Sequence, residues 1–324
     1  MFRAGVGVAR LPMSRPRPLK RPYTTHYEPR VHIPLLRPVI WSVGACSTIY
    51  LASAAYEVYQ DAQRAQAKGS RWGRSKPIQT FEELEHLSGR EPTNSLLHSA
   101  RRPAASERSE FSDSERLTVG IMGAAAGVHV AYNIMPAMKP HFVHTPALSS
   151  NYTLLTSVFG HGGLVHLGLN LYGMYHFVPS AADSPTFRGS NAHLTAFYLS
   201  AGILSSLAQH VTAIWPQRNV TMSSLGASGA LFALFGIVGV AYPNTQIGII
   251  FLPGSLPIGE AMACLALFDA VGIFVRYPGV HLGHAAHLGG LALGVGYAKY
   301  GGDKRIWRPG RKLMFNAMRS LRLL

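Results

Sequence analysis

The sequence contains few charged residues for its length. Only 14% of its 324 residues are Asp, Glu, Lys or Arg, which is about half the share typical of soluble domains. Hydrophobic residues make up 48% of the chain, and the mean hydropathy is above zero. The shortage of charge therefore indicates a membrane protein rather than an ordinary soluble domain.

Cysteine is also scarce. The two cysteines, Cys46 and Cys264, both lie in apolar segments, which excludes a disulfide framework and a Cys-based zinc site. The string His-Glu-x-x-His of many zinc proteases is absent. A zinc site built from histidines stays open as an alternative, but we expect no metal and no other cofactor. Its candidate ligands are four histidines: His161, His166, His284 and His287.

The net charge of +15 belongs mainly to the two ends of the chain. It is not arranged as a basic patch interleaved with aromatics, so we expect no nucleic-acid partner. Residues 1–35 are rich in Arg and lack the apolar core of a secretory signal, which predicts a mitochondrial presequence. A basic arm that binds anionic lipid is the alternative. Residues 301–324 form a second basic tail.

The apolar segments predict an all-α membrane protein. A first run at 36–57 is long enough to cross a bilayer once, and residues 58–115 form a charged extramembrane connector. Residues 116–300 follow as a core of six helices, giving a 1+6 arrangement. The six segments are 117–137, 164–182, 192–214, 225–242, 246–274 and 284–300. Pro253 and Pro257 lie inside the fifth segment, so that helix should be broken or tilted. Two spans separated by a re-entrant turn are the alternative.

Ser228 is the first candidate for chemistry, in the string Gly226-Ala227-Ser228-Gly229. It lies at the predicted start of a helix, where unpaired backbone N–H groups and the helix dipole favour negative charge. The flanking glycines leave its hydroxyl sterically open. The alternative is that these small residues only let helices pack closely.

His287 is the second candidate, near the start of the last apolar segment. His287, Gly290 and Gly294 stand at i, i+3 and i+7, so the imidazole and a smooth glycine seam share one helix face. If the seam packs on the helix of Ser228, the imidazole can take the hydroxyl proton. An incidental histidine at the membrane surface is the alternative.

Further polar residues lie in other apolar segments. His166 and Asn170 are one turn apart and point the same way, which suits two donors to an oxyanion. His161 lies just before that helix or at its start. Asp269 is an intramembrane acid that pairs with a histidine near the last helix, faces water, or serves as a third member beside Ser228 and His287.

Together these strings resemble the rhomboid family of intramembrane serine proteases, and most closely its mitochondrial presenilin-associated-rhomboid-like branch. The resemblance covers about residues 113–300. It implies a dyad in which Ser228 is the nucleophile and His287 the base, without an acidic third member, so the resemblance does not favour that role for Asp269. It also implies an oxyanion hole made by His166, Asn170 and the backbone N–H of Ser228, with His161 as an auxiliary residue. Phe232 stands where some bacterial members have tyrosine and would help orient His287.

The resemblance implies a multi-pass protein of the mitochondrial inner membrane that cuts single-span membrane proteins in or near their transmembrane helices. Substrates would enter sideways from the lipid bilayer, past the fifth segment. A catalytically inactive rhomboid-like binding protein and a channel or transporter are the alternatives. The basic residues at both ends give no orientation by the positive-inside rule, and the sequence does not determine the oligomeric state.

Overall fold

A computed structural model describes residues 33, 35–71, 78–89, 111–148, 150–217, 219–248, 253–275, 277 and 282–324. Residues 33–324 cluster as one unit. The described part is mostly helical, which confirms the predicted all-α class. Residues 1–35, the predicted presequence, lie almost entirely outside the described residues, as does much of the predicted connector.

Six helices correspond to the six predicted core segments. They are α3 (Asp113–Ile134), α5 (Leu164–Ala182), α6 (Asn191–Ile214), α7 (Ser228–Ala241), α8 (Ile258–Phe274) and α9 (His284–Lys299). Local sequence fixes several of their starts. Ser112 and Glu115 form a reciprocal capping box at α3, and the Ser190 hydroxyl accepts a hydrogen bond from the His193 N–H at α6.

Three further helices lie outside this core. They are α1 (Leu36–Arg71), α2 (Phe81–Ser88) and α10 (Arg308–Ser320). Short helical turns fill the connections: η2 (Pro136–Phe142), η3 (Pro146–Leu148), α4 (Thr153–Thr156), η4 (Ser157–Phe159) and the π-helical η5 (Asp303–Trp307). The helix expected over 36–57 thus continues to Arg71.

The expectation of one interrupted helix over 246–274 is wrong. Gln246–Ile247 (β1) pairs antiparallel with Leu256–Pro257 (β2), and α8 begins only at Ile258. Pro257 is the residue before the helix, where its missing N–H leaves no helical hydrogen bond unmade. Pro257 therefore ends the second strand of a hairpin, Pro253 lies between the two strands, and neither proline breaks a helix.

Two of the described helices are long and apolar enough to cross a membrane, over Leu36–Ala67 and Asp113–Ile134. The apolar α7 has 14 residues, which is shorter than the roughly 20 that a simple spanning helix needs. The 1+6 arrangement of transmembrane helices therefore stays a prediction.

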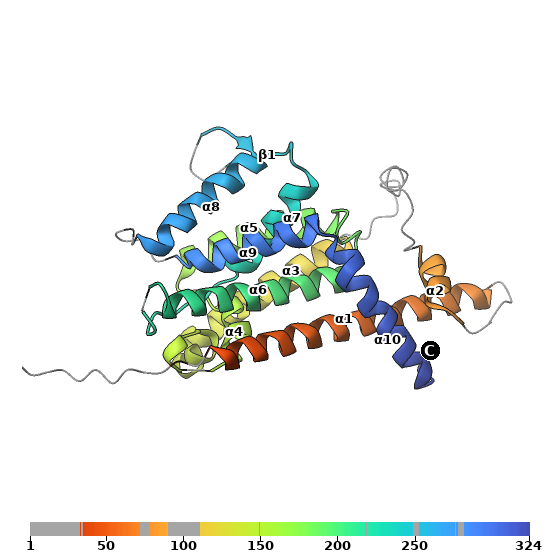
Figure 1. The fold of residues 1–324 in the computed structure, drawn as a ribbon. Coiled ribbons are helices and arrows are strands. Elements are labelled where there is room, and N and C mark those ends of the chain that lie inside the picture. The colour runs from red at the N-terminus through yellow and green to blue at the C-terminus, as the bar shows by residue number, and fades with distance from the viewer. Residues whose placement is uncertain are drawn as a thin grey trace, which may run out of the picture. The chain divides into compact units, whose positions relative to one another are not determined.

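Helix α7 is the centre of the core (Figure 1). It packs against α5, α6, α8 and, most extensively, α9. The contact with α9 is a glycine seam, because a Cβ at Gly290 would lie 2.0 Å from the Gly229 carbonyl oxygen and one at Gly294 would lie 1.9 Å from that of Ala233. Only glycine permits backbones to approach so closely. The predicted seam between the helices of Ser228 and His287 is confirmed.

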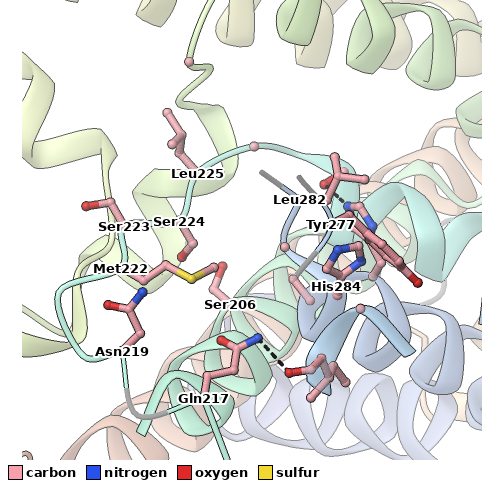
Figure 2. Close-up of a pocket in the computed structure, with 18 of the residues that line it drawn as sticks. Ser206, Gln217, Asn219, Met222, Ser223, Ser224, Leu225, Tyr277, Leu282 and His284 are labelled. Carbon is pink, nitrogen blue, oxygen red and sulfur yellow. Dashed lines mark hydrogen bonds between the residues drawn. The ribbon is translucent and has the colours of Figure 1, made fainter. Parts of the chain in front are cut away.

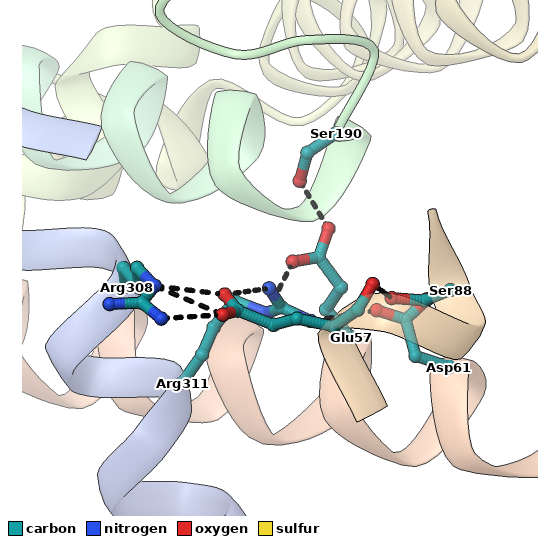
Figure 3. Close-up of polar contacts among 7 residues, drawn as sticks. Glu57, Asp61, Ser88, Ser190, Arg308 and Arg311 are labelled. Atoms are coloured by element: carbon teal, nitrogen blue, oxygen red, sulfur yellow. Dashed lines mark hydrogen bonds and ion pairs between the residues drawn. The ribbon is translucent and has the colours of Figure 1, made fainter. Parts of the chain in front are cut away.

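Helix α1 packs along α6, and its later turns meet α2 and α10 in a buried ion-pair cluster (Figure 3). Arg311 of α10 lies 2.9 Å from Glu57 and 2.8 Å from Asp61, both of α1, and 3.6 Å from Glu85 of α2. Glu57 also accepts a hydrogen bond from the Ser190 hydroxyl, which caps α6. We call these four charged residues the Arg311 cluster.

Candidate active site

Ser228 and His287 lie in hydrogen-bonding contact, although 59 residues separate them in the sequence. The Ser228 Oγ is 2.8 Å from the His287 Nε2, a distance at which an imidazole can accept the hydroxyl proton. His287 is buried, with 6% of its surface exposed. The glycine seam produces this contact, because it brings the first turn of α9 against the first turn of α7.

Backbone pairing fixes the segment that leads into Ser228. His144 and Ser224 exchange two backbone hydrogen bonds of 2.9 and 2.8 Å, and the Gly226 N–H donates to the Ser157 carbonyl at 2.9 Å. Gly226 has a φ of +124°, and a Cβ there would lie 2.8 Å from the His166 ring. Both observations require glycine at this position. Ser228 then begins α7, so its N–H has no helical acceptor.

The ring of Phe232 lies flat against the imidazole of His287. The two ring centroids are 4.3 Å apart and their planes differ by 2°. Since Phe232 follows Ser228 by one helical turn, the same helix supplies the hydroxyl and one wall for the base. This contact restricts rotation of the imidazole without offering it a hydrogen bond.

His166 of α5 faces the same site. Its Nδ1 accepts a hydrogen bond of 3.3 Å from the Gly162 N–H, so the neutral ring carries its proton on Nε2. That Nε2 is the ring nitrogen that approaches Gly226, two residues before Ser228. His166 thus presents an N–H donor beside the serine.

Asn170 and His161 are placed differently from His166. The Asn170 side-chain amide donates 2.8 Å to the backbone carbonyl of His166, and its carboxamide oxygen is buried. His161 is fully buried beside His166, with ring centroids 5.2 Å apart. Its carbonyl accepts a hydrogen bond from the Tyr132 hydroxyl. Asn170 therefore contacts the backbone of His166, and His161 packs against its ring.

Asp269 and His284 extend the site on the side of His287 away from the serine. The Asp269 Oδ1 lies 2.6 Å from the His284 Nδ1 and 3.3 Å from the His287 Nδ1. From the sequence alone, three roles stayed open for Asp269, and His284 was a candidate only for binding a metal. Their spacing carried a signal, since His284 and His287 at i and i+3 lie on one helix face. What the spacing could not show is that α8 places a carboxylate between them.

A cavity of about 680 Å³ opens onto these groups. Ser228, His166, His284 and His287 line it, together with the loop before α7 and the end of α8. Figure 2 shows Met222, Ser223 and Leu225 on that loop, with Tyr277 and His284 across the cavity. The cavity therefore separates α5 from the C-terminal end of α8, with the serine on its wall.

Helix α6 contributes a support that the sequence did not indicate. The Gln209 side-chain oxygen accepts a hydrogen bond of 3.3 Å from the Ala286 N–H, next to His287. This caps one of the free donors in the first turn of α9. Among the described residues, no three His, Cys, Asp or Glu side chains group as a metal site.

The part of the sequence that contains this site is shared with known proteins. Residues 148–304 match the rhomboid domain, and this range contains every candidate site residue above. The presenilin-associated rhomboid-like protein, mitochondrial, of Mus musculus is 30% identical over 209 residues, which are 63% of this chain and 53% of that protein. The Homo sapiens protein of the same name gives the same identity and coverage.

Rhomboid protein 1, mitochondrial, of Saccharomyces cerevisiae is 31% identical over 159 residues, which are 47% of this chain and 42% of that protein. The chain spans about half the length of the curated relatives it matches. The resemblance to rhomboid proteins and to their mitochondrial presenilin-associated-rhomboid-like branch is thereby confirmed.

Proposed function

We propose that this chain, with its rhomboid domain, is an intramembrane serine protease of the mitochondrial inner membrane. The observation that carries the proposal is the 2.8 Å contact between the Ser228 Oγ and the His287 Nε2 on the wall of a cavity. A nucleophile and a base in contact, beside free N–H donors, are the parts that acyl transfer needs.

The reaction follows from these positions. His287 takes the proton of Ser228 as the serine oxygen attacks the scissile carbonyl carbon. The carbonyl oxygen becomes an oxyanion, which the Ser228 N–H and the His166 Nε2–H stabilise. His287 then gives its proton to the leaving amine as the C–N bond breaks. Water, activated by the same imidazole, hydrolyses the acyl-enzyme.

The protein would cross the membrane with one helix before a core of six, the 1+6 arrangement. Its substrates would be single-span membrane proteins that enter this core sideways from the bilayer. The cavity has α5 on one side and the end of α8 on the other, which favours entry between these two helices. Helical substrates shield their carbonyls by internal hydrogen bonds. Segments with Gly or Pro near the cut should therefore be preferred, because they unwind at lower cost.

The test is cleavage of a single-span substrate by the full chain in liposomes. We expect Ser228→Ala and His287→Ala each to lower cleavage below detection, because removing either member costs nearly as much as removing both. Ser206→Ala is the matched control, since Ser206 also lines the cavity but is not the serine in contact with His287. Chelators should leave the rate unchanged.

The substrate should be used in two forms, with Gly or with Leu near the cut, and the Gly form should be cleaved faster. Full activity in a folded Ser228→Ala variant would overturn the proposal. A wild type that binds the substrate without cutting it would instead favour an inactive rhomboid-like binding protein.

A further inference from the structure

Asp269 is a buried carboxylate to which the proton transfers described above give no role. Only 1% of its surface is exposed, and it lies on α8, beside His287. Its Oδ1 is shared by two imidazoles, at 2.6 Å from the His284 Nδ1 and 3.3 Å from the His287 Nδ1. A buried carboxylate is expensive at membrane depth, so its position calls for a role.

The contact with Asp269 determines which nitrogen of His287 carries the proton. An ionised carboxylate only accepts hydrogen bonds, so the facing Nδ1 must be the protonated nitrogen. The Nε2 is then unprotonated and directs its lone pair to the Ser228 Oγ at 2.8 Å. This is the tautomer that a general base requires, whereas a proton on Nε2 would block proton transfer from the serine.

We infer that Asp269 is a positioning residue for His287 and makes the site a Ser–His–Asp arrangement instead of a dyad; the inference rests on the proposed protease function. During attack the proton moves from Ser228 to the His287 Nε2 and stays on the imidazole until the amine leaves. Asp269 holds the tautomer and stabilises the positive ring, and it does not take the proton itself.

His284 holds Asp269 in this place. Its contact with the carboxylate is the shorter of the two, and its Nδ1 donates in the same way. The His284 ring sits over Gly272, where a Cβ would lie 2.6 Å from three of its atoms. Gly272 follows Asp269 by one turn of α8, so the glycine makes room for the imidazole beside the acid.

The surroundings of His287 contain few other titratable groups. In the described part of the chain, α8 presents Asp269, α9 presents His284, and α5 presents His166 across the cavity. Tyr277 lines the same cavity. Helices α6 and α7 present Gln209 and Ser228, which carry no charge. Asp269 is thus the anion available to the imidazolium of His287.

The test compares Asp269→Asn with wild type in liposomes. We expect kcat to fall roughly 10- to 100-fold with KM unchanged. This loss of kcat is smaller than the loss expected in a triad whose acid and base are in closer contact. The acidic limb of the kcat–pH profile should move to lower pH, because the imidazolium loses its carboxylate. Asp269→Glu should recover part of the rate. Asp303→Asn, which removes a carboxylate on η5, is the matched control and should change nothing.

Labelling of Ser228 by a fluorophosphonate probe separates this inference from the proposed function. We expect Asp269→Asn to slow labelling by a factor similar to the fall in kcat. If wild type is labelled and cleaves through Ser228 but Asp269→Asn matches it in rate and pH profile, the inference fails and the protease function stands. If wild-type Ser228 neither labels nor cleaves, both fail.

A second pair of variants serves if Asp269→Asn does not fold. His284→Ala removes the donor that anchors the carboxylate, and His284→Asn replaces it with an amide donor. We expect His284→Ala to lower kcat severalfold and His284→Asn to retain most of the rate. Equal rates in the two variants would contradict the role of Asp269 as an anchored acceptor.

Discussion

At the scale of single residues, His166 and Asn170 look equivalent in the sequence but not in the structure. Both lie on one face of α5, which predicts two donors to an oxyanion. The structure directs the His166 Nε2 toward the serine segment, whereas Asn170 donates to the His166 carbonyl. Spacing along a helix predicts a shared direction, but it does not show which of two side chains reaches a neighbouring helix.

The first residue-scale prediction follows from this difference. His166→Ala should lower kcat by roughly 100- to 1,000-fold, which is the usual cost of removing one oxyanion donor. Asn170→Ala should have a smaller effect, because the side chain only supports the backbone of His166. Single-turnover cleavage of one substrate by both variants measures the two losses. Equal losses would show that Asn170 reaches the oxyanion directly.

Ser228 and His287 could be singled out from the sequence because their strings are local. Ser228 lies between glycines and His287 precedes a glycine seam, and each string can be recognised without its partner. The two residues beside His287 carry no such local string: only the family resemblance indicated Phe232, and the sequence left three roles open for Asp269. Asp269 approaches His287 from α8 and Phe232 from α7, so their contacts depend on how three helices pack.

At the scale of elements, the glycine seam between α7 and α9 sets the distance between the side chains of Ser228 and His287. Gly294→Ala should force the helices apart, because the new Cβ would lie 1.9 Å from the Ala233 carbonyl oxygen. We expect a loss of about 1–3 kcal/mol in the free energy of unfolding, as is typical of overpacking, together with slower cleavage. Thermal unfolding in detergent and cleavage of one substrate measure both effects.

Gly296→Ala is the control for this substitution. Gly296 lies on the same helix, but a Cβ at this position would have no atom of a neighbouring segment within 4 Å. Alanine also favours the helix more than glycine, so this variant should be as stable as wild type or slightly more stable. Similar losses in both variants would mean that helix α9 tolerates no added methyl group, and that the seam has no special role.

The limits of the sequence also show at this scale. Apolar runs predicted six core helices, and each of the six has a counterpart in the structure. The fifth was wrong at its start, because a run of apolar residues with Pro and Gly is compatible with both a bent helix and a hairpin. The backbone pairing of β1 with β2 decides between them, and no periodicity in so short a strand reveals it.

At the scale of the whole molecule, the Arg311 cluster joins three distant parts of the chain. Glu57 and Asp61 come from α1, Glu85 from α2 and Arg311 from α10. The sequence places Glu57 at the end of the first apolar run, Asp61 and Glu85 in the charged connector, and Arg311 in the basic tail. Their pairing was not predicted, since paired charges far apart in sequence look like solvated ones. The hydrogen bonds from Arg308 to Glu85 raise the pKa of Arg308 and add a second arginine of α10 to the contacts of Glu85.

The last prediction concerns what this cluster does for the molecule. Its side chains are at most 5% exposed, so Arg311→Met would remove the guanidinium from three buried carboxylates, those of Glu57, Asp61 and Glu85. Removing one member of a buried ion pair costs about 3–5 kcal/mol, mostly through the charge left behind. We therefore expect a clearly lower melting temperature in detergent.

Lys312→Met is the control. Lys312 lies on α10 like Arg311, but it forms an exposed ion pair with Glu82 of α2, so this variant should melt like wild type. Because the cluster is not part of the catalytic site, Arg311→Met should still cleave substrate at temperatures below its transition. An unchanged melting temperature for Arg311→Met, or an equal loss in Lys312→Met, would show that the cluster does not hold α1 and α10 to the core.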